Sequence, residues 1–146
     1  MLYLTRRERF SAAHRMFKPE WTDEENLKVF GKCSNPNWHG HDYILYVTVK
    51  GNISEESGLV INMNIIKEII KERIIDKVDH RNLNLEVDFM KGLNATTENL
   101  AVAIWNELEE PLRRAGGELY RIRIDETENN IVEYYGKENQ STGKRD

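Results

Sequence analysis

Three side chains within nine positions are the most suited to chemistry in this chain. Cys33, His39 and His41 lie in the stretch CSNPNWHGH, which begins at residue 33. Cysteine and histidine this close together are typical of a structural zinc knot, a metal catalyst or a cysteine nucleophile, and they also occur together by chance. Because Cys33 is the only cysteine of the sequence, a closed Cys₂His₂ or Cys₄ zinc knot within one chain is excluded.

The spacing of the two histidines predicts that they point the same way. Residues 39–50, HGHDYILYVTVK, are rich in β-branched and aromatic side chains and are predicted to form a strand. Side chains two apart on a strand share a face, so His39 and His41 would present their imidazoles in parallel. Residues 2–14 also alternate, and His14 would end a strand face that carries Phe10 and Ala12.

Pairing of these two strands would bring three histidines into one site. Three neutral nitrogen ligands without a fourth protein ligand are typical of a catalytic zinc site, in which water or substrate takes the open position. Histidines two apart are also common without any function. The pattern therefore favours metal binding by His14, His39 and His41 but leaves chance spacing open.

Two helices and two more strands are predicted further along the chain. Asn62 can cap a helix that runs to about residue 78, in which isoleucine recurs every four positions. A second helix should begin near Thr97, be perturbed by Pro111 and end at the glycines 116–117. Residues 118–126 and 130–136 are expected to form a closing hairpin.

The predicted order of strand, strand, helix, helix, strand, strand indicates an α+β domain. It favours a four-stranded antiparallel sheet with two helices on one face. We expect the domain to span residues 1–136, with residues 15–38 as a long irregular excursion and the polar residues 137–146 as a disordered tail. Since four strands leave exposed edges, edge-to-edge assembly of several chains is also expected.

Length, charge and composition argue against nucleic-acid binding, a membrane span and secretion. The chain has 146 residues, enough for one domain with a core, and its net charge of −4 comes without a basic cluster, so nucleic acid is not an expected partner. No run of about 18 apolar residues exists that would span a membrane. The N-terminus MLYLTRRERF does not resemble a signal peptide, and a single cysteine suits a reducing, cytoplasmic location.

Five motifs in sequence order give the chain a resemblance to a known family. It resembles the 6-pyruvoyltetrahydropterin synthase family, which also contains the 6-carboxytetrahydropterin synthases of the queuosine pathway. The resemblance runs from residue 10 to about residue 136. The motifs are FSAAHRM, CSNPNWHGHDY, VDHRNLN, TTENLA and DETENN.

The resemblance implies a cofactor, a fold and an assembly. It implies Zn²⁺ bound by His14, His39 and His41. It also implies the tunnelling fold, in which three subunits join their sheets into a barrel and two trimers stack as a homohexamer. Active sites in such an assembly would lie where subunits meet.

Catalytic roles are likewise implied for three residues. By resemblance, Cys33 is the general base that removes a carbon-bound proton, and Asp79 orients His80, which exchanges protons on the other face of the substrate. A thiol beside a cation loses its proton more readily, and a histidine pKa near 6.5 suits proton transfer in both directions. The residue types alone also allow a small buried cysteine and a solvated Asp-His pair.

A carboxylate at the end of an apolar strand face predicts a polar partner. Glu126 would follow Ile122 and Ile124 on one face, and burying its charge costs free energy unless a donor pairs with it. By resemblance, Glu126 anchors the amidine edge of a pterin, assisted by Thr96 and Thr97, with Glu98 and Glu128 as less certain neighbours. An exposed hairpin glutamate is the alternative.

The implied substrate is 7,8-dihydroneopterin triphosphate, converted to 6-pyruvoyltetrahydropterin with loss of triphosphate. The stretch PNWHGH resembles the PNGHGH of the pyruvoyl branch, and five residues separate Cys33 from His39 where the carboxy branch commonly has three. The carboxytetrahydropterin product, formed with release of acetaldehyde, is the alternative, as is a non-catalytic pterin- or metal-binding homologue. Arg15 and Arg81 are candidates for holding the triphosphate.

Overall fold

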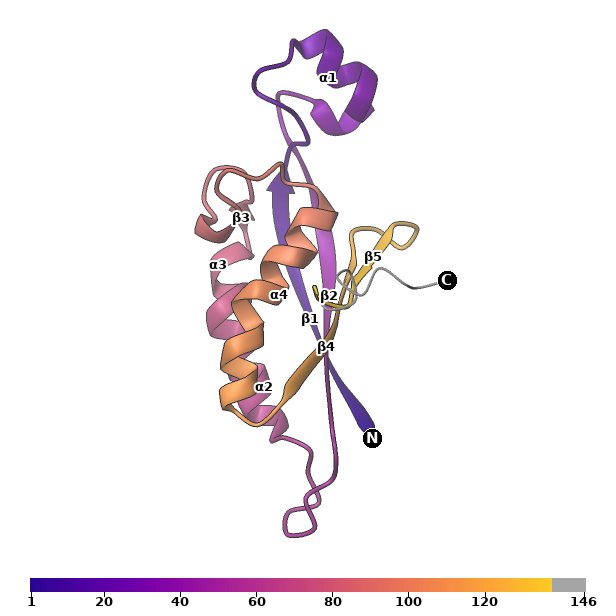
Figure 1. Ribbon diagram of the computed structural model, residues 1–146. Coiled ribbons are helices and arrows are strands. Elements are labelled where there is room, and N and C mark those ends of the chain that lie inside the picture. Colours follow the sequence, from indigo (N-terminus) through magenta and orange to yellow (C-terminus); the bar gives the residue numbers. More distant parts are fainter. Residues whose placement is uncertain (138–146) are drawn as a thin grey trace, which may run out of the picture.

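A single five-stranded sheet organises the computed structural model, which describes residues 1–137 (Figure 1). The strands lie in the order β3-β1-β2-β4-β5. Neighbours pair antiparallel except β3, which runs parallel to β1. The strands are β1 (Leu2–His14), β2 (His39–Gly51), β3 (Arg81–Asn82), β4 (Glu118–Asp125) and β5 (Ile131–Tyr134).

The predicted α+β class is confirmed, but the prediction of four antiparallel strands is wrong. The sheet is mixed because Arg81 and Asn82 pair parallel with Ala12 and Ala13 on the outer edge of β1. A two-residue strand is too short to show alternation in the sequence, so periodicity does not reveal it. The predicted tail lies outside the described residues except for Lys137.

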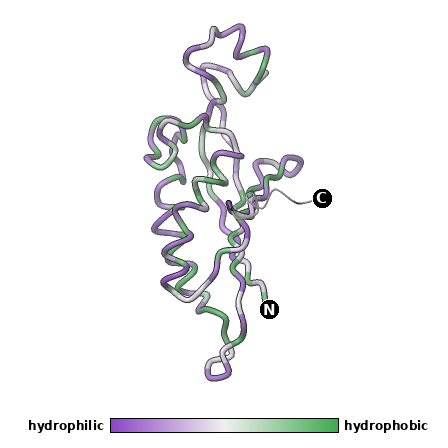
Figure 2. Tube along the Cα trace, in the orientation of Figure 1, coloured by the Kyte–Doolittle hydropathy of each residue, from purple (hydrophilic) through white to green (hydrophobic). Residues whose placement is uncertain are grey.

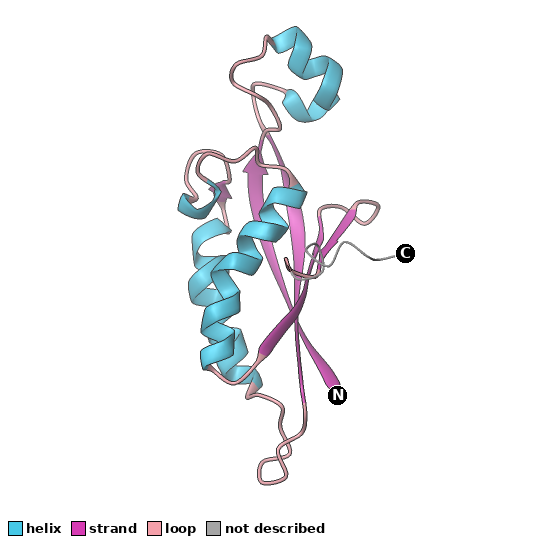
Figure 3. Ribbon diagram, in the orientation of Figure 1, coloured by secondary structure: helices cyan, strands magenta, loops and turns pink. Residues whose placement is uncertain are grey.

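Two long helical segments cover one face of the sheet and leave the other face uncovered (Figure 3). The first consists of α2 (Met63–Ile70), the π-helical turn η2 (Lys71–Ile75) and α3 (Asp76–Val78), which follow one another without a break. The second is α4 (Thr97–Arg114). None of the helices within residues 1–137 is both long and apolar enough to cross a bilayer.

Both helix starts follow from capping side chains. The Asn62 side-chain oxygen accepts a hydrogen bond from the backbone N–H of Asn64 at 2.9 Å, and the Thr96 hydroxyl accepts one from the N–H of Asn99 at 3.1 Å. Pro111 lies inside α4 without ending it, and the chain turns at Gly116, where φ is 96°.

The core lies between the helices and the sheet. Ile66, Ile70 and Ile74 on the first helical segment are at most 1% exposed and belong to one buried cluster with Leu45 and Val47 of β2. Burying each such side chain stabilises the fold by roughly 1.5–3 kcal/mol. Figure 2 shows the matching alternation of hydrophobic and hydrophilic residues along both helices.

The excursion between β1 and β2 is more regular than predicted. It contains α1 (Asp23–Phe30) and the 3₁₀ turn η1 (Gly31–Ser34), and another 3₁₀ turn, η3 (Asp88–Met90), precedes α4. The Thr22 hydroxyl caps α1 by accepting from the N–H of Glu25 at 3.1 Å, and three acidic residues fill the first turn. In Figure 1 this excursion stands beyond one end of the sheet, where β1 ends and β2 begins.

Candidate metal and substrate site

Three imidazoles converge at the end of the sheet where β1 meets β2. His14 pairs directly with His39 across the two strands, and His41 follows two residues later opposite Ala12. The ring centroids are 4.5–5.1 Å apart, and one ring nitrogen from each residue lies within 4.8 Å of the others. The strand pairing expected from the sequence therefore does bring these side chains together.

The close pairing of the strands here requires a small residue. Gly40 lies between the two histidines of β2, opposite Ala13. A β-carbon built on Gly40 would lie 3.2 Å from the carbonyl oxygen of Ala12, which is tighter than an ordinary contact. Glycine thus lets β1 and β2 stay in register where their imidazoles meet.

The ring nitrogens of this cluster fit a bound divalent metal. The Nδ1 of His14 donates to the carbonyl oxygen of Ala95 at 2.7 Å, which leaves the Nε2 lone pair for another partner. The His14 Nε2, both ring nitrogens of His39 and the His41 Nε2 are buried without a hydrogen-bond partner. Unpaired buried nitrogens are costly, and a metal ion would satisfy one nitrogen of each of the three rings.

Burial also favours the metal-binding form of His14 and His39. It lowers the pKa of His14 and of His39, and neighbouring imidazoles lower both further. Neutral imidazoles offer lone pairs, and three of them suit zinc with one open position. Within residues 1–137 no fourth histidine, cysteine or carboxylate joins the group.

Cys33 lies in η1, on the excursion that rises beyond the histidines. Its carbonyl oxygen accepts a hydrogen bond from the N–H of Met16 at 2.8 Å, which ties the turn to the chain just after His14. The side chain is half-buried. Burial, and then the charge of Glu126, raise the pKa of the Cys33 thiol, so the thiol needs a nearby positive charge to ionise at neutral pH.

Arg15 fastens the turn that carries Cys33. Its Nε donates to the carbonyl oxygen of Ser34 at 2.8 Å, its guanidinium lies 3.9 Å from the centroid of the Phe17 ring, and it is 3.5 Å from Asp23. The side chain is only 13% exposed. Arg15, considered from the sequence as a triphosphate ligand, is therefore occupied with contacts inside its own chain.

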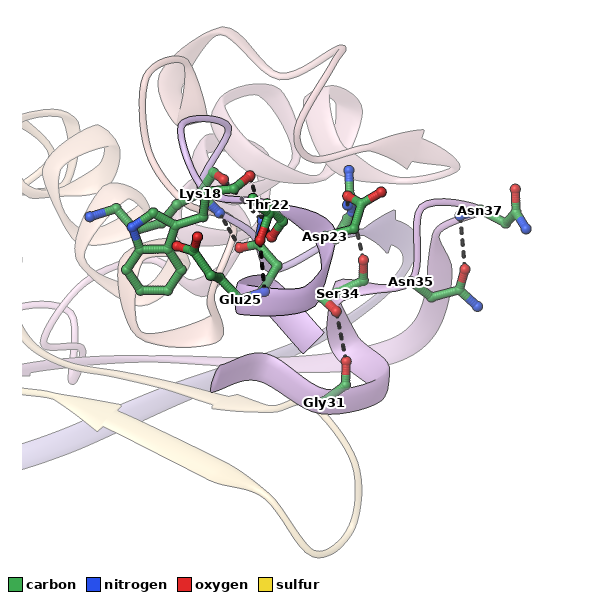
Figure 4. Close-up of polar contacts among 11 residues, drawn as sticks. Lys18, Thr22, Asp23, Glu25, Gly31, Ser34, Asn35 and Asn37 are labelled. Carbon is green, nitrogen blue, oxygen red and sulfur yellow. Dashed lines mark hydrogen bonds and ion pairs between the residues drawn. The ribbon is translucent and has the colours of Figure 1, made fainter. Parts of the chain in front are cut away.

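Local hydrogen bonds hold the rest of the excursion (Figure 4). The Ser34 hydroxyl donates to the carbonyl oxygen of Gly31 at 2.8 Å, and the Asn35 side chain accepts from the N–H of Asn37 at 3.0 Å. Buried Asn26 accepts from the N–H of Lys18 at 2.8 Å and donates back to the Lys18 carbonyl oxygen at 3.1 Å. These bonds fix the path of a segment that has few apolar contacts of its own.

Glu126 lies beside the histidines, just after β4. Its Oε2 accepts a 2.5 Å hydrogen bond from the buried Thr97 hydroxyl and is 4.0 Å from the Nε2 of His14. The carboxylate side chain is 15% exposed. Thr96 is adjacent, but its hydroxyl oxygen caps α4. Glu98 and Glu128 are exposed and make no contact with this group.

Asp79 and His80 lie elsewhere, on the outer edge of β1. The Asp79 carboxylate accepts from the N–H of Ser11 at 2.9 Å, and the N–H of His80 donates to the carbonyl oxygen of Ser11 at 2.7 Å. The Nδ1 of His80 is 3.1 Å from Asp79, and the imidazole side chain is 83% exposed. The Ser11 N–H is the main cause that lowers the pKa of Asp79, which is therefore ionised at neutral pH.

The backbone at His80 is unusual, and the region around it is hollowed. His80 has a φ of 60°, a left-handed conformation that non-glycine residues rarely adopt. The hollow is lined by residues that include Ser11, His41, His80 and Arg81, so one histidine of the cluster borders it together with His80. His80 therefore does not join the group of three imidazoles, although it borders the same hollow as His41.

Tyr43 is a site residue that the sequence analysis missed. It follows His39 and His41 on the same face of β2, is fully buried, and its hydroxyl has no hydrogen-bond partner. Burial, and then the charges of Glu126 and Cys33, raise the pKa of Tyr43. The alternation H-x-H-x-Y contains the signal, because every second residue of this strand faces the same way.

Trp38 and Arg81 lie close in the sequence to the proposed site residues His39 and His80. Trp38 directly precedes β2 with a φ of 67°, and its ring lies edge-on to Phe17 at 6.5 Å. Arg81 is exposed, and its Nη1 lies 3.5 Å from Glu86. Arg81 also borders the hollow that His41 and His80 line.

Comparison with known proteins identifies the family. Residues 3–137 match the family model described as 6-pyruvoyl tetrahydropterin synthase. The chain is 46% identical over 134 residues to the human 6-pyruvoyl tetrahydrobiopterin synthase, covering 92% of this chain and 91% of that protein. This chain belongs to the 6-pyruvoyl tetrahydropterin synthase family.

A solved structure and a more distant relative refine the comparison. The Caenorhabditis elegans 6-pyruvoyl tetrahydropterin synthase superposes with a TM-score of 0.83 at 37% identity, covering 92% of this chain and 95% of that chain. The 6-carboxy-5,6,7,8-tetrahydropterin synthase of Rickettsia typhi is 30% identical over 125 residues, covering 74% of this chain and 80% of that protein. The chain is thus more similar to the pyruvoyl relatives than to this carboxy relative.

Proposed function

We propose that this chain is a zinc-dependent lyase that converts 7,8-dihydroneopterin triphosphate into 6-pyruvoyltetrahydropterin and triphosphate. The observation that carries the proposal is the cluster of three imidazoles with unpaired buried nitrogens, one of which lies 4.0 Å from the carboxylate of Glu126. The 46% identity to a protein named 6-pyruvoyl tetrahydrobiopterin synthase supports the choice of substrate and product. The reaction needs no external reductant, because the redox change is internal to the substrate.

His14, His39 and His41 would hold the zinc ion. A zinc ion bound there supplies a Lewis acid that polarises the hydroxyl groups of the substrate side chain and acidifies the adjacent carbon. The hydrogen bond from His14 to the Ala95 carbonyl fixes the tautomer and the orientation of that ring.

Glu126 would anchor the pterin ring. Its carboxylate can accept both the N3–H and the 2-amino N–H of the pterin, as a carboxylate does from any paired donor edge. Thr97 holds one carboxylate oxygen with a 2.5 Å hydrogen bond and so sets its direction before the ligand arrives. Thr96, at the cap of α4, supports the same segment.

Cys33 would act as the general base. The thiol is half-buried in η1, and the hydrogen bond from Met16 to the Cys33 carbonyl ties this turn to the chain just after His14. Once ionised, the thiolate takes the proton from the acidified carbon of the side chain. Triphosphate then leaves by elimination, and tautomerisation gives the pyruvoyl product.

Asp79 and His80 would serve a neighbouring subunit. The pair directly precedes β3 at the outer edge of the sheet, outside the group of three imidazoles, and its imidazole is open to solvent. Edge-to-edge pairing of such sheets places that edge against another chain. We therefore include in the proposal a barrel formed by three subunits and a homohexamer of two trimers, with Asp79 orienting the His80 that returns the proton.

The rival product requires the same site. A 6-carboxytetrahydropterin synthase would release acetaldehyde and triphosphate, and the Rickettsia typhi relative carries that name. Its identity of 30% is well below the 46% of the human protein. A non-catalytic binding role is disfavoured because Cys33 and His80 are both present.

The test is product identification by mass spectrometry. Purified, zinc-loaded protein incubated with 7,8-dihydroneopterin triphosphate is expected to give triphosphate and a pterin that keeps its three-carbon side chain. Acetaldehyde release would instead assign the carboxy reaction. The Cys33→Ala variant should keep its zinc and lose turnover, and wild-type activity in that variant would refute the assigned base.

A further inference from the structure

The Tyr43 hydroxyl is a buried group of the candidate site to which the proposed roles assign no task. The ring stacks on Phe10, with centroids 4.9 Å apart and planes at 12°, and its edge meets His14 and His41 at 6.0 and 5.5 Å. The residue is 0% exposed. Packing therefore accounts for the ring but not for its oxygen.

An unpaired hydroxyl at this depth is unfavourable in the free protein. The Tyr43 oxygen has no hydrogen-bond partner, and leaving a buried donor unpaired costs free energy that phenylalanine would not cost. Buried tyrosines normally find a partner for their hydroxyl. A ligand that supplies an acceptor would account for the tyrosine.

The strand register places Tyr43 next to His41 and Glu126, which belong to the two groups proposed to bind the ligand. It lies two residues after His41 on the same face of β2. Ile44 pairs with Asp125, so the next pair of positions along the two strands is Tyr43 and Glu126.

The order of atoms on a pterin matches this arrangement. The donor pair of N3–H and the 2-amino group is followed along one edge by the carbonyl O4, then N5, then C6 with its side chain. With the donor pair on Glu126 and the side chain on the histidine cluster, the edge carrying O4 and N5 passes over Tyr43. Both of those atoms accept hydrogen bonds.

We infer that Tyr43 is a substrate-binding residue whose hydroxyl donates a hydrogen bond to the O4 and N5 edge of the bound pterin. The inference rests on the proposed function, since it takes the pterin orientation from Glu126 and the histidines. It adds a recognition contact for the ring, between the anchor and the metal.

Tyr43→Phe is the variant that tests it, because only the oxygen is removed. The matched control is Tyr134→Phe, which removes the hydroxyl of a tyrosine that is 8% exposed and packs on Trp105, away from the site. Affinity for neopterin, a pterin that is not turned over, is measured by calorimetry on the zinc-loaded wild type and both variants. Zinc content and the Tm without ligand are measured alongside.

In Tyr43→Phe the Kd for neopterin is expected to rise roughly 5- to 100-fold, the range for leaving a buried acceptor unpaired. Zinc content should match the wild type, and the Tm without ligand should be equal or higher, because the unpaired hydroxyl is gone. Tyr134→Phe should bind neopterin as the wild type does.

Two results would overturn the inference while the proposed function stands. One is a Kd in Tyr43→Phe within twofold of a wild type that binds neopterin and is active. The other is a Tm several degrees lower without ligand, which would make the hydroxyl structural. If the wild type neither binds neopterin nor turns over the substrate, the proposed function fails first and the inference falls with it.

Discussion

Removing the Thr97 hydroxyl is the sharpest test of how Glu126, the proposed pterin anchor, is held in place. Thr97→Val keeps the shape of a side chain that is 5% exposed and deletes the donor to Glu126 Oε2. A hydrogen bond to a charged group contributes about 1.5–3 kcal/mol. The Glu126 side chain keeps 15% exposure and so some access to water, which favours a value of about 2 kcal/mol.

Such a loss has two measurable consequences. The KM for 7,8-dihydroneopterin triphosphate should rise roughly 10- to 30-fold with little change in kcat, because the anchor is the same in the ground state and the transition state. The Tm should fall by about 4–8 °C. Steady-state kinetics and differential scanning calorimetry measure the two effects.

Thr48→Val is the matched control. Thr48 is 3% exposed, its hydroxyl pairs with that of Thr5 at 2.8 Å, and it lies far along β2 from the histidines. Its loss should lower the Tm while KM stays unchanged. An unchanged KM in Thr97→Val, or an equal rise in Thr48→Val, would refute the assignment of Thr97 to the anchor.

Three further predictions concern the metal, the strand edge and the excursion. His39→Ala should lose bound zinc by elemental analysis whereas His80→Ala retains it; full zinc in the first variant would contradict the ligand set. The hydrogen bond from Ser11 lowers the pKa of Asp79 in the folded protein, so the ionised carboxylate stabilises the fold. This stabilisation should be complete above the pKa of about 3.9 that Asp79 has in the unfolded chain, and it should vanish as the pH falls through the lower pKa of the folded protein. The Tm gap between wild type and Asp79→Asn should therefore close in acid, and a gap that persists below pH 2 would argue against it. Arg15→Ala removes the hydrogen bond to the Ser34 carbonyl, so the turn that carries Cys33 should open more often and iodoacetamide should alkylate Cys33 several-fold faster. An unchanged rate would show that Arg15 does not stabilise this turn.

Local periodicity was enough to predict the part of the site that lies on strands. Alternation places His14, His39 and His41 on facing positions, and the register His14 with His39 follows from pairing two strands of equal length. The two helices were likewise predictable from isoleucine spacing and from the caps Asn62 and Thr96.

The rest depended on contacts between distant segments. The strand Arg81–Asn82 exists only because it meets β1, and no two-residue pattern signals that contact. Asp79 and His80 lie at the sheet edge because both form hydrogen bonds with Ser11. Ser11 and Asp79 are 68 residues apart in the sequence. The helix after Thr22 was a missed local signal, since a threonine followed three residues later by glutamate is a capping pattern.

One short backbone segment supports two ends of the candidate site at once. The carbonyl of Ala95 fixes the imidazole of His14, and two residues later Thr97 fixes the carboxylate of Glu126. A shift at the start of α4 would disturb both contacts. A metal ion bound at the histidines is therefore expected to hold Glu126 in place, and a ligand bound to Glu126 is expected to hold His14 in place. Thermodynamic linkage then requires the effect to be mutual: the cation should raise the affinity for the heterocycle by the same factor as the heterocycle raises the affinity for the cation.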